Sequence, residues 1–442
     1  MLFIIIKKYI INNFLYIVYI KKMALPQKLN YNSHISASHS RQYTSEINCQ
    51  NTNNHATSST AIINIPSAKN LFLDGQSLSL QMDMVVTPSA GGNTVVSLDR
   101  CGAIGAIERL RIFSGSQLLQ DVNGYGNLMS MLTSHQHSHD NIKGRQAVLS
   151  GTNTNLIGHS FGTIADGASA TARFVLPLTS ILSTSDKYFP LHALSGPLRV
   201  EIQFVSSALK LVTSTRAITS IAFNNVKVIA SYLEVSDAGM NIINKAQNGR
   251  PFEYVCTNFA NFQSNVTVAN GVESRFNLPI PAKYASTKAL YSTFRPHSAG
   301  AVNKLPYDSV SCALDEFTLT VGSQVMPSQP VKGLPNMLLE LDKAFGVASN
   351  SLAPCGYVKS QYTTTSPAGN ATNSNAFAIG MDLESYSGKM EGVYRGMNTT
   401  ASDIYLNLVF SGAQTGAIKV DTYVSFDQMV SIDDSGVPVV QY

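Results

Sequence analysis

The clearest pattern of hydrophobic and polar positions lies between residues 173 and 204. At its end, four apolar residues from Leu198 to Phe204 alternate with polar ones. This period of two predicts a half-buried antiparallel strand. Residues 174–176 predict another strand at the start, and Pro190 and the turn at 195–197 leave room between them for about one or two helical turns. The segment therefore predicts a strand, a short helix, a loop and a second strand.

Similar apolar runs, separated by turn residues, recur along the whole chain. They predict strands at 61–65, 77–86, 107–113 and 218–235, and at 276–280, 314–321, 376–383, 403–410 and 420–432. Asp74-Gly75 predicts a turn before the strand at 77–86. Short helical patterns occur at 127–132 and 336–345. The pattern predicts a mainly β protein, whose two halves repeat in layout but not in sequence.

The length of 442 residues suits about two domains of ordinary size. We place the first domain at 57–236 and the second at 261–442. The residues between them, 237–260, contain a short helical pattern with glycines and form the predicted linker. Residues 23–56 are polar and almost free of apolar periodicity, so we predict an extended N-terminal arm there.

Residues 1–22 differ from the rest of the chain. They are strongly apolar but are interrupted by the pairs Lys7-Lys8 and Asn12-Asn13. No small-residue cleavage site precedes Met23, as a signal peptide would require. The segment predicts either a leader upstream of the natural start near Met23, which we favour, or a weak membrane anchor.

Charge narrows the possible functions. Charged residues make up only 13% of the chain, about half the usual share for a soluble protein. So few charges indicate that much of the surface is covered by contacts with other molecules. The net charge is +4, and four of the lysines lie in residues 1–22, so the rest of the chain is neutral. Binding to DNA or RNA phosphates needs concentrated Lys and Arg, so we expect no direct sequence-specific nucleic-acid binding.

Two motifs suggest chemistry. Gly158-His-Ser160-Phe-Gly162 matches the nucleophile elbow of esterases, but an elbow needs a strand before it and a helix directly after it. Here the sequence predicts a loop followed by a strand, so Ser160 is expected to be a loop residue. His135, His137 and His139 would share one face of a strand and could then bind zinc. Because they follow a helical pattern, we expect a solvated loop instead.

The remaining candidates have simple interpretations. Five cysteines, an odd number without CxxC spacing, predict free thiols in a reducing compartment. Three sequons begin at Asn265, Asn370 and Asn398, and without a convincing signal peptide we interpret them as loop asparagines. Asp433-Asp-Ser-Gly436 lacks the other ligands of a calcium loop and predicts a hairpin turn. No phosphate-binding loop and no dinucleotide fingerprint occur, so we expect no cofactor.

Several segments together resemble the double-jelly-roll major capsid proteins of polinton-like viruses and of polinton (maverick) and adintovirus-type elements. In the first half these are IERLRIFSGSQLLQDVNGYGNLMSML and LPLTSILSTSDKYFPLHALSGPLRVEIQF. In the second half they are DEFTLTVGSQVMPSQPV, LLELDKAFG, FAIGMDLES and VDTYVSFDQMVSIDDSGVPVV. Each is a soft pattern, and their shared order makes the resemblance specific. It extends from about residue 60 to the C-terminus.

The resemblance implies two consecutive eight-stranded jelly rolls with short helices in their loops. It further implies a structural protein of the virion without catalytic residues, which assembles inside the host cell. Three copies would form a pseudo-hexagonal capsomer of an icosahedral shell around double-stranded DNA. Its partners would be further copies of itself, penton and minor capsid proteins, and a host receptor, and the polar arm would tie neighbouring capsomers or an internal membrane layer.

Two alternatives remain at this point. The first is a jelly-roll module that binds glycans or a receptor, although the absence of Trp removes the residue that most often lines such pockets. The second is a minor capsid protein, which usually needs only one jelly roll, whereas this chain has the length for two.

Overall fold

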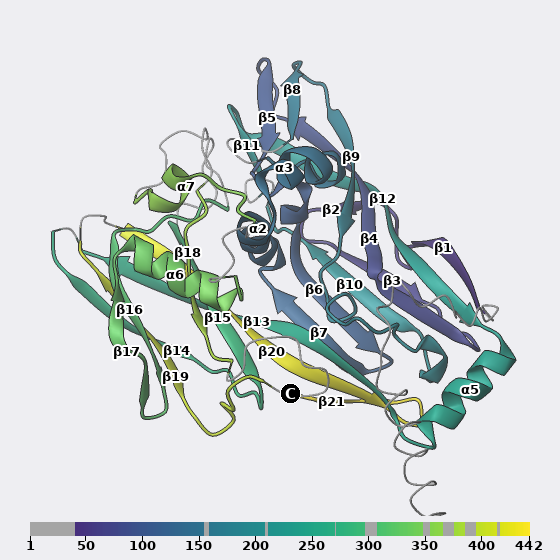
Figure 1. Cartoon of the computed structure of the whole chain (residues 1–442). Coiled ribbons are helices and arrows are strands. Elements are labelled where there is room, and N and C mark those ends of the chain that lie inside the picture. The colour runs from purple at the N-terminus through teal and green to yellow at the C-terminus, as the bar shows by residue number, and fades with distance from the viewer. Residues whose placement is uncertain are drawn as a thin grey trace, which may run out of the picture. The chain divides into compact units, whose positions relative to one another are not determined.

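A computed structural model describes residues 40–153, 159–207, 211–269, 271–296, 307–347, 354–365, 375–384, 395–412 and 416–442. The predicted leader at 1–22 and the arm residues 23–39 lie outside the described residues. The described residues form five antiparallel sheets with short helices between their strands (Figure 1). No helix in them is long and apolar enough to cross a membrane.

The first half contains two four-stranded sheets that share one core. In spatial order the first consists of β1 (Ser40–Asn48), β12 (Ile218–Val235), β4 (Leu71–Pro88) and β9 (Ala170–Pro177), with β2 (His55–Ala56) beside β12. The second consists of β3 (Thr60–Ile65), β10 (Leu198–Phe204), β6 (Ile107–Ser114) and β7 (Gln117–Asn123). The rings of Phe204 in β10 and Phe223 in β12 stack 4.2 Å apart, which shows that the two sheets face each other.

The second half repeats this arrangement. One sheet consists of β13 (Phe252–Val268), β20 (Gly416–Ile432), β15 (Thr287–Pro296) and β18 (Ala378–Asp382), with β21 (Pro438–Gln441) beside β20. The other consists of β14 (Ser274–Ile280), β19 (Ile404–Phe410), β16 (Leu314–Val321) and β17 (Gln324–Lys332). The rings of Phe294 in β15 and Phe410 in β19 meet edge to face at 6.1 Å in the shared core.

Both halves have the same strand order. If β2, β5, β8, β11 and β21 are set aside as additions, each half has eight described strands. Numbered along the chain within each half, the strands form sheets in the order 1-8-3-6 and 2-7-4-5. Two such four-stranded sheets packed face to face form a jelly roll. The chain is therefore a double jelly roll, with a first roll of strands β1 to β12 and a second roll of strands β13 to β20.

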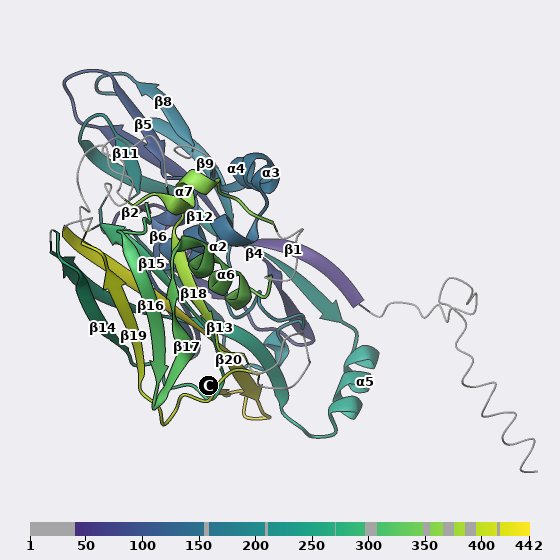
Figure 2. The same cartoon turned by 60° about the vertical axis from the view of Figure 1, so that its left-hand side comes forward.

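The first roll carries an additional small sheet. Strands β11 (Val212–Ser214), β5 (Thr94–Leu98) and β8 (Ser160–Ile164) form it, and it lies at one end of the first roll in both views (Figures 1 and 2). The described helices are α2 (Tyr125–Gln136), α3 (His139–Asn141), α4 (Ala147–Ser150), α5 (Asp237–Gln247), α6 (Leu334–Ala344) and α7 (Lys359–Thr363). Helix α5 connects the rolls, and the Ser236 side chain accepts a hydrogen bond from Gly239 N at its start.

Most strands and both longer helical patterns predicted from the sequence are confirmed. The segment 173–204 has the predicted form: β9, one turn of 3₁₀-helix at Leu191–Ala193, and β10, whose alternate residues are buried. The turn at Asp74-Gly75 is wrong, because both residues lie inside β4 at an irregularity of its pairing with β12. A Cβ on Gly75 would lie 1.8 Å from the Leu182 carbonyl oxygen, so the glycine permits a close backbone approach rather than a turn.

Two predicted boundaries are also corrected. Residues 40–48 are not part of an arm but form β1, which pairs along its whole length with β12. Nearly all its side chains are exposed, so no apolar alternation marks it in the sequence. The predicted linker 237–260 is too long, because β13 begins at Phe252. A deletion of residues 24–56 would therefore remove a strand of the first roll.

Candidate functional site

The most elaborate polar arrangement in the described residues is the junction where the first roll meets the sheet β13-β20-β15-β18. Helix α2 lies between the two rolls (Figure 1). Asn127 in α2 donates its Nδ2 hydrogens to Thr293 Oγ1 at 2.9 Å and to the Tyr423 hydroxyl at 3.1 Å. That hydroxyl in turn donates to the Gly124 carbonyl at 2.8 Å. These bonds join the first roll to strands β15 and β20 of the second.

Buried side-chain amides form a second link. Gln120 in β7 donates to Asn258 Oδ1 at 3.1 Å, and Asn258 donates to Gln428 Oε1 at 2.6 Å. Gln428 returns to the first roll by donating to the Leu119 carbonyl at 2.8 Å. Buried amides of this kind are stable only when their hydrogen bonds are made, so the two rolls are held in one specific relation.

A buried cluster of charges forms a third link. Asp99, which directly follows β5 in the first roll, accepts the backbone N–H of Tyr307 at 2.7 Å. The neighbouring Arg100 donates to Ser134 in α2. Asp308 accepts the Asn375 N–H at 2.7 Å. Burial, together with the nearby Asp99 carboxylate, raises the pKa of Asp308 to about 6.

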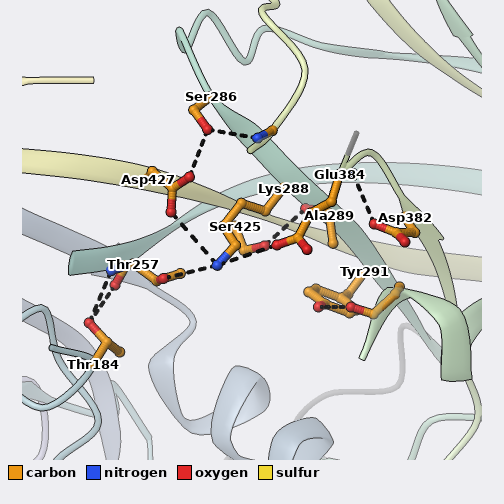
Figure 3. A network of polar contacts seen from close by, with 12 residues as sticks. Thr184, Thr257, Ser286, Lys288, Ala289, Tyr291, Asp382, Glu384, Ser425 and Asp427 are labelled. Carbon is orange, nitrogen blue, oxygen red and sulfur yellow. Dashed lines mark hydrogen bonds and ion pairs between the residues drawn. The ribbon is translucent and has the colours of Figure 1, made fainter. Parts of the chain in front are cut away.

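A pocket of about 460 Å³ opens beside this junction. Its walls come from α2, β13, β15, β18, β20 and the end of α6. Figure 3 shows Lys288 in it, between Glu384 Oε1 at 3.4 Å and Asp427 Oδ1 at 3.7 Å, with its amine donating to Thr257 Oγ1 at 3.4 Å. Thr257 N in turn donates to Thr184 Oγ1 of the first roll at 3.1 Å.

The contacts of the charged residues in this pocket favour a structural role for them over a catalytic one. The Lys288 amine lies between two carboxylates, those of Glu384 and Asp427, and is therefore occupied by ion pairs. Asp427 is also held, because its Oδ2 accepts the Ser286 hydroxyl at 2.7 Å. Burial and the nearby Glu384 raise the pKa of Asp382. In the described part of the chain, Lys288 thus pairs with Glu384 and Asp427, and Asp382 accepts the Glu384 N–H.

The three candidate histidines do not converge. His135 is buried in α2, where its Nε2 lies 2.9 Å from the Ala376 carbonyl oxygen, and burial lowers its pKa to about 3. His137 ends the helix with Nδ1 2.8 Å from Asn141 Nδ2, and His139 begins α3. On a helix, residues two apart point to different sides. The predicted solvated loop is thus wrong for His135, and the described residues contain no cluster of three or more His, Cys, Asp or Glu that could hold a metal.

The esterase-like motif does not form an elbow. Ser160 is the first residue of β8 rather than a loop residue, and its Oγ accepts the Gly162 N–H at 3.1 Å. Strand β8 leads to β9 and not to a helix. His159 packs its ring against Phe161 and Phe174 instead of facing the Ser160 hydroxyl as a base. Gly158 lies outside the described residues.

The other candidates behave as ordinary structural residues. All five cysteines are free, as predicted, and burial raises the pKa of Cys49 to about 11 and that of Cys312 to about 12. Asn265 lies on β13, and Asn398 accepts the Thr400 N–H at 3.0 Å; Asn370 is outside the described residues. The predicted hairpin turn at 433–436 is confirmed between β20 and β21.

Sequence reasoning missed the junction itself. Asp421, Ser425 and Asp427 alternate with apolar residues in β20, and such a pattern ordinarily indicates a strand with one side in water. In the structure all three are buried, because the first roll and α6 cover that side. The only signal was that a largely hydrophobic strand carried carboxylates without nearby turn residues.

Comparisons with known proteins identify the fold. No protein-family model matches the sequence, and no curated protein matches it. Solved structures match along nearly the whole chain. VP54 of PBCV-1, fitted into a reconstruction of the virophage Sputnik, has a TM-score of 0.62 at 11% identity and covers 93% of this chain and 100% of its own.

Two further structures agree. The Faustovirus major capsid protein has a TM-score of 0.62 at 9% identity, with 94% of each chain covered. The mavirus major capsid protein has a TM-score of 0.56 at 10% identity, with 95% of this chain and 96% of that chain covered. This chain therefore has the fold of double-jelly-roll major capsid proteins, which its own strand order also defines.

Proposed function

We propose that this protein is the major capsid protein of an icosahedral double-stranded DNA virus or virus-derived element. The observation that carries the proposal is the repeated strand order, 1-8-3-6 and 2-7-4-5, in two rolls joined by a buried polar junction. Two like blocks in fixed relation let three chains present six like blocks in a closed ring. Such a homotrimer is the pseudo-hexagonal capsomer that the resemblance implies.

The fold neighbours support a structural role. The Faustovirus and mavirus neighbours are major capsid proteins by their descriptions, and the paired charges beside the junction favour scaffolding over catalysis. In this proposal the protein is not an enzyme, acts in the virion, and binds further copies of itself along with penton and minor capsid proteins. The division into rolls falls at α5, between Val235 and Phe252.

The test is the solution mass of the full chain by light scattering during size-exclusion chromatography. The proposal predicts a species of three times the 47.6 kDa chain mass. A monomer at all concentrations would overturn the capsomer and favour a jelly-roll binding module. Incubation of the trimer at rising protein and salt concentration should then give closed shells, visible by electron microscopy.

A further inference from the structure

A small cavity lies inside the chain where helix α2 of the first roll meets the second roll. Its wall comes from Arg100 and α2 on one side, and from β15, Tyr307, Ser309 and residues 375–377 on the other. None of the lining residues is more than 8% exposed. The cavity is therefore enclosed by the fold, and both rolls contribute to its wall.

Arg100 brings a buried donor without a partner to this cavity. The residue is only 5% exposed. Its Nη2 donates to the Ser134 hydroxyl, whereas its Nη1 has no hydrogen-bond partner among the described residues. The nearby carboxylates of Asp99 and Asp308 accept backbone N–H groups instead. Because a buried N–H group that stays unpaired is costly, Arg100 Nη1 needs an acceptor.

The opposite wall provides a second donor. Thr293 in β15 is buried, and its Oγ1 accepts a hydrogen bond from Asn127 Nδ2 at 2.9 Å. That bond uses the hydroxyl oxygen, so the hydroxyl hydrogen remains for a further acceptor. Ser130 in α2 also lies in the wall and carries another hydroxyl. Polar groups of both rolls thus face the same small space.

The size of the cavity limits what can fill it. Its volume is about 10 Å³, which is close to the space that a single water molecule needs. A sulfate ion, a phosphate ion or an organic ligand is too large for it. Cavities that stay empty in proteins have apolar walls, whereas a guanidinium, hydroxyls and amides line this one.

We propose that one hydrogen-bond acceptor of the size of a water molecule or a halide ion occupies this cavity. It accepts hydrogen bonds from Arg100 Nη1 of the first roll and from the Thr293 hydroxyl of the second, so it bridges the two rolls. Water and a halide share this acceptor chemistry, and a halide adds a negative charge beside the buried guanidinium. The site lies within one chain and is independent of capsid assembly.

The first test is diffraction from crystals of the full chain, grown once without halide and once with sodium bromide. Spherical density should lie about 2.7–3.3 Å from Arg100 Nη1 in both crystals. An anomalous bromine signal at this position assigns the site to a halide, and density without that signal assigns it to water. An empty cavity, or an Arg100 Nη1 that binds a protein acceptor instead, would overturn the proposal.

The second test removes the donor. Arg100→Met should abolish the density in the cavity. Arg100→Lys keeps the charge of the side chain but lacks the second terminal nitrogen, so it should also lose the density even if the Met variant fails to fold. Arg145→Met is the matched control, because Arg145 is exposed and lies outside the cavity wall. Density that persists at full occupancy in the Arg100 variants would contradict the role of this residue.

Melting temperatures in solution distinguish the two ligands without crystals. If the ligand is a halide, the wild type should melt at a higher temperature in sodium bromide than in sodium gluconate of equal ionic strength. Arg100→Lys should then lose this difference, and Arg145→Met should keep it. If the ligand is water, the two salts should give the wild type the same melting temperature.

Discussion

Two equivalent sheets of this molecule have opposite surroundings. In the covered sheet, β13-β20-β15-β18, Arg295 pairs with Asp421, and their side chains are 17% and 0% exposed. In the open sheet, β1-β12-β4-β9, Arg173 pairs with Asp83, and their side chains are 63% and 11% exposed. The strand order is the same, yet the first roll covers one sheet and no described part of the chain covers the other. The difference shows that cover by the first roll, and not strand order, decides how exposed an ion pair of this sheet is.

The largest expected effect comes from breaking the two ion pairs. Arg295→Met leaves the Asp421 carboxylate buried without its main partner, which should lower the free energy of unfolding by about 3–5 kcal/mol. Arg173→Met on the open sheet should cost only about 1 kcal/mol, because the arginine is exposed to water and Asn225 still donates a hydrogen bond to Asp83. Urea unfolding of both variants measures the contrast. Equal losses of unfolding free energy in the two variants would contradict the conclusion that the first roll covers one sheet and leaves the other open.

A glycine at the junction tests how closely the two rolls approach each other. Gly124 has φ 63°, and a Cβ there would lie 2.9 Å from the Tyr423 hydroxyl. Gly124→Ala should therefore cost about 2–3 kcal/mol, from the left-handed backbone and the crowding together. Gly115 has φ 58° with no atom within 4 Å of the added carbon, so Gly115→Ala should cost only about 1–2 kcal/mol. Thermal melting of the two variants separates crowding from backbone strain.

The rolls should also differ in their response to acid. The folded pKa of Asp308 is about 6 and its ordinary value is 3.8, so the folded state binds this proton more tightly than the unfolded state. The tighter binding of the proton by folded Asp308 contributes its full stability below about pH 4. This contribution is lost as the pH rises through about 6. Two pKa units correspond to about 2–3 kcal/mol.

Asp308→Asn should therefore raise the melting temperature at pH 7–8 and have little effect at pH 4. Asp83 on the open sheet should behave in the opposite way, because its hydrogen bond to Arg173 lowers its pKa, so its contribution is lost as the pH falls. A melting temperature of Asp308→Asn that follows the wild type from pH 4 to 8 would contradict the assignment.

The smallest effect is expected at the esterase-like motif. Ser160 is exposed, and its hydroxyl oxygen accepts a local hydrogen bond from Gly162 N. Ser160→Ala should change the free energy of unfolding by about 0.5 kcal/mol or less and leave the trimer intact. A fluorophosphonate probe should not label the wild-type protein. Labelling that Ser160→Ala abolishes would show a nucleophile that the fold does not explain.

The sequence predicted the parts of the molecule that depend on local pattern. Alternation placed β10, β12 and β16 because each has one side in a core, and the turn at Asp433–Gly436 follows from its residues. Strand β1 was not predicted, because its nearly all-polar side chains carry no such signal. Only its backbone pairing with β12 defines it. The junction between the rolls was not predicted, for a related reason. Asn127, Asn258 and Tyr423 lie far apart in sequence, and no local pattern indicates that they meet.

The most direct test of the central claim, that three chains place six like rolls in a ring, is imaging of the purified full chain. Negative-stain class averages of the light-scattering peak should show a particle with three-fold symmetry and a hexagonal outline, with three copies by mass. Particles that are monomeric, or that have two-fold symmetry, would contradict the account.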